Sequence, residues 1–461
     1  MSNSEQLKIF DVVDNIEINS SHLRDEMVKN IYDTAEKIAQ DNVSIEETSK
    51  SSWGEKIDDI ITSKWLGFPF MLLMLGAVFW ITIVGANYPS AMLAKLLFWI
   101  EGHISNLFIA LQAPQWLHGI VVEGMYRTLA WVISVMLPPM AIFFPVFTLL
   151  EDLGLLPRVA FNLDNFFKKA GANGKQSLTM SMGFGCNAAG VIAARIIESP
   201  REKLIAILTN NFVPCNGRFP TLIILASLFM GSVLGGAYNS FIAATVVVGL
   251  VLVGIAVTLF ISWLLSKTLL RGIPSSFSLE LPPYRKPKIT EVLLRSFIDR
   301  TLFVLWRAIV VAAPAGLVVW IFANVKIGDL SLIQYAANIL DPFALLIGLD
   351  GIILLAFILG LPANEIVLPI LVMSYLSAGA MLEPSSSESL KNILVNNGWT
   401  WVTALSTMLF SLLHFPCATT LLTIKKETNS LKWTIFAALM PLAVAIVVCF
   451  VFTQITNLLS I

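Results

Sequence analysis

From Lys64 to the C-terminus the sequence contains a series of apolar runs of about 20 residues, the length that a helix needs to cross a bilayer. Of the 461 residues, 56% are hydrophobic and 13% are charged, whereas roughly 25% of the residues in a soluble domain are charged. Because backbone polar groups inside a bilayer must be satisfied within the protein, these runs predict an all-α polytopic membrane protein.

Charge, cysteine content and motifs narrow the function classes. The net charge of −1 gives no indication of nucleic-acid binding. Residues 1–60 are polar and acidic, so no cleavable signal peptide is predicted. The four cysteines lie in apolar segments, unlike a secreted disulfide framework. We find no nucleotide-binding motif, catalytic triad or zinc-hydrolase spacing, so we predict a protein without catalytic residues that is not an enzyme.

The apolar runs also predict the order of elements. Residues 1–60 form a soluble segment, and residues 88–123, which contain Glu101, His103 and His118, are expected on the surface or partly inserted. Amphipathic helices are expected at 158–169 and just before residue 303, and a polar loop at 267–291. Full spans are predicted at roughly 65–86, 125–150, 203–231, 240–266, 303–324, 400–423 and 433–457.

Two stretches of the apolar sequence interrupt their own helices. They are Gly183-Phe-Gly-Cys-Asn187 and Pro214-Cys-Asn-Gly-Arg218. Non-helical backbone at membrane depth is tolerated only where it is buried in protein or lines a polar cavity. Two such breaks, each with a cysteine beside an asparagine, indicate a membrane transporter in which residues 183–219 form part of the pathway.

The distribution of lysine and arginine predicts the topology, because basic loops are cytoplasmic. The basic loops are 156–175, 195–203, 267–300 and 425–432, and the loops with almost no basic residues are 232–239, 325–346 and 377–399. If every segment crossed the membrane, two basic loops would lie outside. The conflict disappears if 176–198 is a re-entrant hairpin from the cytoplasm and 347–376 a re-entrant hairpin from outside. We therefore predict seven full spans, two re-entrant hairpins and a cytoplasmic N-terminus.

This arrangement is an inverted repeat of the order span, surface helix, hairpin, broken span and clean span. Gly183-Phe-Gly-Cys-Asn187 aligns with Gly360-Leu-Pro-Ala-Asn364, and Pro214-Cys215 aligns with Pro416-Cys417. Secondary transporters are often built in this way, with the substrate site at the midplane between the repeats. We expect the site where the broken helices of the two halves meet.

Thiols and amides adjoin the breaks: Cys186, Cys215, Cys417, Asn187, Asn216 and Asn364. A soft thiol together with free carbonyl groups suits a transition-metal ion that hard oxygen ligands alone do not favour. The alternative is that each cysteine is a small residue that permits close packing. The asparagines are either pathway ligands or caps of the half-helices, and we expect capping alone for at least one of them.

Ionisable residues in the same apolar segments are candidates for function. Glu365 is either a cation ligand or a proton acceptor, and the alternative is a salt bridge to Arg218 or Arg307. We expect Arg218 to balance a carboxylate rather than to bind a cation. We interpret His414 as a packed, hydrogen-bonded residue, although imidazole is also a ligand for late transition metals.

Taken together, these motifs resemble the membrane domain of the ferrous iron transport protein B family over roughly residues 55–457. Gly185-Cys-Asn187 and Cys215-x-x-Arg218-x-Pro220 resemble the two gate motifs of that family. Further resemblances are Leu150-Glu-Asp-x-Gly154, Glu280-Leu-Pro-Pro-Tyr284 and Pro416-Cys417-x-x-Thr420. The chain departs from the usual pattern at Ala188-Ala189-Gly190 and at Pro362-Ala-Asn-Glu365.

The resemblance implies import of Fe²⁺ across the cytoplasmic (inner) membrane of a prokaryote, with Fe²⁺ as the transported ion and no permanently bound cofactor. It implies that Cys186, Cys215 and Cys417 are pathway residues, and we add Asn187, Asn216, Asn364 and Glu365 as polar lining. Members of the family usually begin with a GTPase domain and a helical spacer. Because only about 60 soluble residues precede the first span here, we expect the GTPase either on a separate chain, which we favour, or to be dispensable. The other expected partners are a small cytoplasmic accessory protein, membrane lipid and a second copy of the chain.

The expected domains are a spacer-like helical segment at 1–60, a first span and surface segment at 61–123, a first gate repeat at 124–266, a cytoplasmic loop with an amphipathic helix at 267–299, and a second gate repeat at 300–461. Two other functions remain open. Inverted hairpin repeats also suit a carrier of small organic solutes such as nucleosides, in which the cysteines would be inert. A membrane scaffold for a GTPase, without transport, is the third possibility.

Overall fold

The structure, a computed structural model, describes residues 20–42, 58–63, 65–172, 174–230, 239–272, 289–290, 294, 298, 301–381 and 387–459. In the first half the elements are α2 (Ser20–Asn42), α4 (Gly67–Ala110), α5 (Gln115–His118), the π-helix η1 (Gly119–Tyr126), α6 (Arg127–Asp152), α7 (Leu155–Lys169), α8 (Gln176–Gly185), α9 (Asn187–Ala193), η2 (Ala194–Ile196), α10 (Pro200–Thr209), η3 (Asn210–Phe212), α11 (Phe219–Leu225), η4 (Ala226–Met230) and α12 (Asn239–Lys267).

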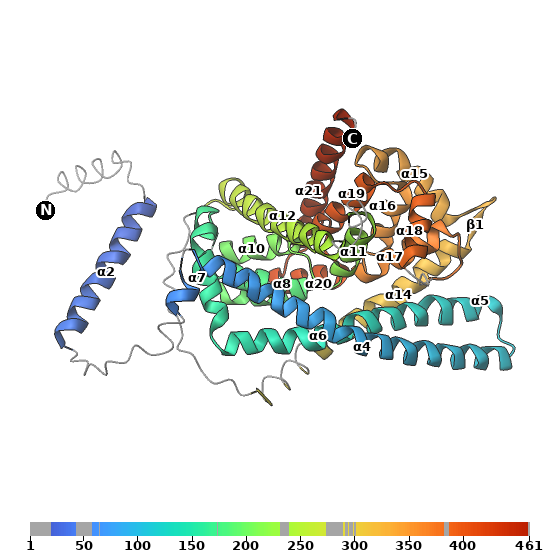
Figure 1. The fold of residues 1–461 in the computed structure, drawn as a ribbon, viewed down its shortest axis with the longest axis horizontal. Helices are drawn as coiled ribbons and strands as arrows, with labels where there is room; N and C mark the ends of the chain where they lie inside the picture. The colour runs from blue at the N-terminus through green and yellow to red at the C-terminus, as the bar shows by residue number, and fades with distance from the viewer. Residues whose placement is uncertain are drawn as a thin grey trace, which may run out of the picture.

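The second half contains α14 (Phe303–Asn324), β1 (Lys326–Ile327), β2 (Leu330–Ser331), α15 (Leu332–Leu346), α16 (Gly351–Leu359), η7 (Asn364–Ile366), α17 (Val367–Tyr375), α18 (Ser387–Asn396), α19 (Trp401–Leu413), α20 (Ala418–Thr428) and α21 (Leu431–Leu458). The helices pack into one elongated body, and α2 stands apart from it (Figure 1). Among the described residues, five helices are long and apolar enough to cross a membrane, or six if α15 and α16, bent by 110°, count as one span. The predicted helical membrane fold is confirmed, whereas the count of seven full spans stays a prediction.

Both predicted breaks in the hairpins occur where the sequence places them. Cys186 separates α8 from α9 with φ −155° and ψ 124°, and Ala363 precedes η7 with nearly the same angles, φ −152° and ψ 121°. One extended residue at equivalent positions therefore reverses the chain in each half. A Cβ atom on Gly190 would lie only 2.7 Å from the Thr179 carbonyl oxygen, so α9 folds back closely onto α8.

The two broken spans also begin alike. The Ser199 side chain accepts a hydrogen bond from the Glu202 amide at the start of α10, and the Thr400 side chain accepts one from the Thr403 amide at the start of α19. These N-caps satisfy amides that have no partner within their own helix. Both spans then lose helical geometry at residues 213–218 and 414–417, as predicted.

Side-chain contacts join three of the basic loops, 156–175, 195–203 and 425–432, at one end of the body. Lys175 Nζ lies 3.1 Å from the Ile196 carbonyl and 3.3 Å from Glu198 Oε1, so residues 176–198 begin and end at the same place. Arg195 forms a bidentate ion pair with Glu427, with distances of 2.8 and 2.6 Å. The first hairpin, the start of α10 and the α20–α21 turn are thereby joined.

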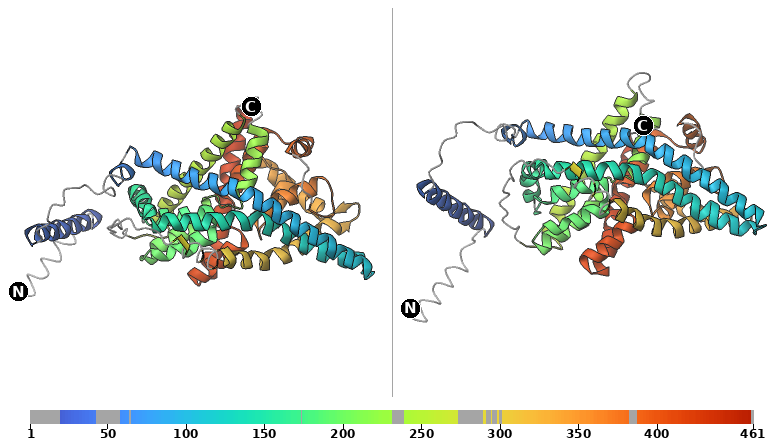
Figure 2. Two further views of the ribbon diagram at one scale, coloured as in Figure 1. Left: turned by 60° about the horizontal axis from the view of Figure 1, so that its bottom comes forward. Right: turned by 90° about the horizontal axis from the view of Figure 1, so that it is seen from below.

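Two of the loops with few basic residues, 325–346 and 377–399, meet at the other end. Asn324 donates to the Gly379 carbonyl at 2.7 Å, and Gln334 donates to Ser377 Oγ at 2.8 Å. The Tyr375 hydroxyl contacts the Asp350 carboxylate, so the second hairpin also begins and ends at one place. Figures 1 and 2 show α7 and α10 toward one end, and α15 and β1 toward the other.

Three sequence predictions are corrected. The helix of the first span does not end near residue 86, because α4 continues as one helix of 44 residues to Ala110 and the chain returns through α5 and η1. The loop after α14 contains a short antiparallel β-hairpin, β1–β2, and the helix α15. The loop at 379–399 contains α18. The predicted central loop at 267–291 and the amphipathic helix before residue 303 lie largely outside the described residues.

Candidate functional site

The two broken spans are hydrogen-bonded to the hairpins of their own halves at the breaks. The Asn216 amide donates to the Gly185 carbonyl at 3.3 Å, and the Ala418 amide donates to the Leu361 carbonyl at 2.8 Å. Each bond joins the residue after a broken-span cysteine to the residues just before the hairpin turn. The non-helical backbone predicted at the two breaks of each half therefore lies together in the fold.

Residues from the two halves meet between these breaks. The Asn364 amide lies 4.0 Å from Cys215 Sγ, and a Cβ atom on Gly217 would collide with the carboxylate of Glu365. The hairpin turn of the second half thus lies directly against the break of the first half. Cys186 and Cys215 each neighbour a residue of the Asn216–Gly185 bond, and Cys417 neighbours Ala418 of the Ala418–Leu361 bond.

The thiols differ in their surroundings. Cys186 and Cys215 are buried, and Cys417 is partly exposed, with Sγ 3.3 Å from Thr420 Oγ1 on the first turn of α20. Cys449 is buried in the core, where its thiol lies 3.6 Å from the Ser406 carbonyl. The first three cysteines therefore belong to the junction, and Cys449 packs elsewhere.

The candidate asparagines lie in different environments. The Asn187 side chain is buried, 3.2 Å from Asn211 Oδ1 and 3.1 Å from the Gly183 carbonyl, and the Asn210 amide donates to the Asn187 carbonyl at 3.1 Å. Asn187 therefore belongs to an amide cluster behind the first turn. Asn216 is partly exposed at the second break. Neither Asn187 nor Asn364 caps a half-helix with its side chain, so the capping prediction is wrong.

Arg218 has a different role from the one predicted. Its buried guanidinium donates to the carbonyls of Asn211 and Leu412, each at 2.8 Å, and to those of His414 and Phe415, each at 3.2 Å. These carbonyls include the unsatisfied end of α19, which carries partial negative charge. Arg218 thus satisfies the end of the broken helix from the other half. The expected carboxylate partner is not found among the described ion pairs.

Glu365 lies at the edge of a cavity. It is partly exposed, and it lines a space of about 430 Å³ between α4, α6, α11 and α17. The proposed salt bridge to Arg218 is absent from the described ion pairs, and the side chain of Arg307 lies outside the described residues. Glu365 thus connects this cavity with the break at Gly217.

His414 is packed, as predicted. Its Nδ1 atom lies 3.0 Å from the Phe410 carbonyl and 2.9 Å from the Ser411 carbonyl, and rings of Phe357, Phe410 and Phe415 surround it. The sequence interpretation missed the roles of Asn210 and Asn211. An Asn-Asn pair within an apolar run was the available signal.

The junction is a row of separate donors rather than a closed cage. In the part of the chain that the structure describes, no three histidine, cysteine, aspartate or glutamate side chains are grouped closely enough to hold one metal ion. Cys215, Asn364 and Glu365 instead follow one another from the second break toward the cavity. Such a series can pass an ion from donor to donor without enclosing it.

Comparison with known families agrees with this architecture. One family model, Gate, described as nucleoside recognition, matches twice, at residues 133–229 and 305–431. A second model, described as ferrous iron transport protein B C terminus, matches residues 247–299 between them. By these matches the chain resembles the membrane domain of the ferrous iron transport protein B family. The two Gate matches fall one in each half, where the hairpins and broken spans repeat.

Curated relatives in this family extend over most of the chain. The Fe(2+) transporter FeoB of Staphylococcus aureus (strain MSSA476) is 29% identical over 447 residues, covering 94% of this chain and 63% of the relative. That of Methanocaldococcus jannaschii is 28% identical over 451 residues, with the same coverage. A relative from Porphyromonas gingivalis is named a fusion of Fe(2+) transport protein A and Fe(2+) transporter FeoB. It is 26% identical over 464 residues, and the match covers 89% of this chain and 53% of the relative. This chain spans less than two thirds of the length of these relatives. No solved structure matches it.

Proposed function

We propose that this chain forms the membrane pathway of a ferrous iron transporter, which moves Fe²⁺ into the cytoplasm. The observation that carries the proposal is the contact between the halves, where Cys215 adjoins Asn364 and Gly217 adjoins Glu365. A thiol, an amide oxygen and a carboxylate in series suit a borderline-soft divalent ion better than an alkali or alkaline-earth ion. Cys186, Cys417, Asn187 and Asn216 complete the proposed lining at the same breaks.

The topology we propose has seven full spans and two re-entrant hairpins, with gate repeats at 124–266 and 300–461. The basic end, where Lys175, Arg195 and Glu427 meet, would face the cytoplasm, because basic loops remain on that side. The N-terminus would lie on the same side, and the membrane would be the cytoplasmic membrane of a prokaryote. Both hairpins would then enter from opposite sides and meet at the midplane.

Energy and partners complete the proposal. A GTPase on a separate chain would control the gate, with residues 1–60 contributing a spacer-like contact. A small cytoplasmic accessory protein is a further proposed partner, supported by the name of the fused Porphyromonas gingivalis relative. Self-association in the membrane is also proposed. In this scheme the chain itself carries no catalytic residue and no permanently bound cofactor.

The test is uptake of ⁵⁵Fe²⁺ under reducing conditions by cells that lack other iron importers and express this chain. Cys186→Ser and Cys215→Ser should each lower uptake strongly, because each substitution removes a soft sulfur donor from the junction. Cys449→Ser is the matched control and should retain uptake, since Cys449 lies in the core away from the junction. Unchanged uptake in both junction variants, at equal expression, would contradict the metal pathway.

The alternative is transport of a small organic solute such as a nucleoside. The description of the Gate model, nucleoside recognition, is the observation in its favour. In that case Asn364 and Glu365 would hydrogen-bond the solute, and the cysteines would only pack. Uptake of labelled uridine that survives both cysteine substitutions, together with competition by other nucleosides, would support this alternative and exclude the first.

A further inference from the structure

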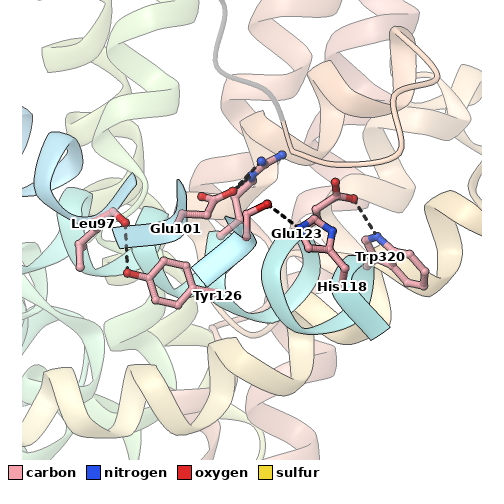
Figure 3. Close-up of polar contacts among 8 residues, drawn as sticks. Leu97, Glu101, His118, Glu123, Tyr126 and Trp320 are labelled. Atoms are coloured by element: carbon pink, nitrogen blue, oxygen red, sulfur yellow. Dashed lines mark hydrogen bonds and ion pairs between the residues drawn. The ribbon is translucent and has the colours of Figure 1, made fainter. Parts of the chain in front are cut away.

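A second polar cluster lies away from the junction, where α4 approaches η1. Arg127 donates to Glu101 Oε1 from Nε at 2.8 Å and from Nη2 at 2.6 Å. Ser105, one helical turn after Glu101 on α4, lies 2.7 Å from Nε2 of His118. Figure 3 shows Glu101 and His118 near the π-helix, together with Glu123, which accepts a bond from Trp320. Single-turn π-helical irregularities are frequent at functional sites.

Glu101 is an unusual residue for an apolar helix. Its side chain is buried, with 7% of the residue exposed, and its Oε2 atom has no hydrogen-bond partner among the described residues. An ionisable group in a membrane segment is costly and is usually retained for function. Arg127 satisfies only one of the two carboxylate oxygens, so Glu101 retains an unused acceptor.

The same residues line a cavity of about 480 Å³. Its walls are Phe98, Glu101, Gly102, Ser105, Arg127, Trp131 and Met381. Met381 belongs to the loop after α17, which lies at the end with few basic residues. This cavity is therefore on the side opposite the basic loops.

The two cavities form a series. Phe98 and Trp131 line both the cavity that contains Glu101 and the cavity that contains Glu365. Glu365 then contacts the second break at Gly217, beside Cys215. A cation that entered at Met381 would pass Glu101, then the walls that the two cavities share, then Glu365 and the thiols.

We propose that Glu101 and Ser105 form a capture site for the incoming divalent cation, and that Arg127 is a counter-ion which the cation displaces. The inference rests on the proposed function, because it assigns the outer entrance of the same pathway. A carboxylate and a hydroxyl are hard oxygen donors, which suit an ion that still retains part of its hydration shell. His118 positions the Ser105 hydroxyl through the bond at 2.7 Å. Arg127 balances the carboxylate while the site is empty.

The experiment measures equilibrium binding of Mn²⁺ to the full chain in nanodiscs, with free Mn²⁺ quantified by electron paramagnetic resonance. Glu101→Gln should weaken the outermost site about tenfold or more, since it removes a charged ligand. Arg127→Gln should strengthen that site, because the cation no longer competes with the guanidinium. Glu123→Gln is the matched control, since Glu123 lines neither cavity, and its Kd should equal that of the unmodified chain.

A double variant separates binding from a purely structural ion pair. If Glu101 and Arg127 only stabilise the fold, Glu101→Gln with Arg127→Gln should restore Mn²⁺ binding that either single variant has lost. If Glu101 binds the cation, the double variant should bind as weakly as Glu101→Gln. Loss of binding in both single variants, or an unchanged Kd in Glu101→Gln, would overturn the capture site. Iron uptake by the unmodified chain is a separate measurement, so failure here leaves the proposed function standing, and failure of uptake leaves the binding result intact.

Discussion

Replacing Arg218 by methionine should destabilise the protein far more than replacing an exposed arginine such as Arg271. The guanidinium is 1% exposed and donates to four backbone carbonyls, two of them at 2.8 Å. Methionine has similar length and fills the space, but it donates no hydrogen bond. The carbonyls of Asn211 and Leu412 would then be buried without this partner.

The expected loss of unfolding free energy follows from the two bonds of 2.8 Å, to the carbonyls of Asn211 and Leu412. A hydrogen bond to a charged group contributes about 1.5–3 kcal/mol, so losing both costs about 3–6 kcal/mol. Removing a buried charge recovers part of its desolvation penalty, and the His414 carbonyl keeps its bond of 2.7 Å from the Asn211 amide. We expect a net loss of about 3–5 kcal/mol. The unfolding free energy of Arg218→Lys should lie between those of the unmodified chain and Arg218→Met, because lysine retains the charge but lacks the planar guanidinium.

The assay is thermal unfolding of the purified chain in detergent, followed by tryptophan fluorescence and by the monodisperse fraction on size exclusion. Arg271→Gln is the control, because Arg271 is exposed and donates only to the Lys267 carbonyl one turn earlier, at 3.1 Å. Arg218→Met should unfold at a clearly lower temperature than Arg271→Gln. Equal unfolding temperatures would refute the conclusion that Arg218 joins the two halves through the end of α19.

Three further substitutions test the hairpin and the junction. Gly190→Ala would place a Cβ atom 2.7 Å from the Thr179 carbonyl, so the first hairpin must open. We expect the unfolding free energy to fall by about 1–3 kcal/mol. An unchanged unfolding temperature in the same assay would contradict this expectation. Gly217→Ala would press on the Glu365 carboxylate and should reduce ⁵⁵Fe²⁺ uptake several-fold at normal expression; full uptake would show that this contact is not on the path. A cysteine in place of Pro200 should react with a membrane-impermeant maleimide from the cytoplasmic side, whereas reaction from outside alone would exclude the proposed re-entrant hairpin.

Local patterns predicted most of the helices, and their failures have an identifiable cause. The helix predicted at 303–324 is α14, and the expected break at 185–187 is centred on Cys186, because apolar length and helix breakers are encoded locally. The first span was predicted to end near residue 86, since the polar residues Glu101, His103 and His118 follow. In the structure α4 continues past Glu101, because Arg127 from the returning helix pairs with it. A partner 26 residues away is invisible to a hydropathy pattern.

The sequence alone therefore determined that this protein is a helical membrane protein, where its helices break and how its halves repeat. These properties depend on hydrophobic length, on glycine and proline, and on the distribution of lysine and arginine. Only the tertiary structure decided which polar groups meet. It placed Asn364 beside Cys215, turned Arg218 toward the carbonyls at the end of α19, and enclosed Asn187 among other amides. Such contacts join segments far apart in the chain, and their geometry is set by packing rather than by local composition.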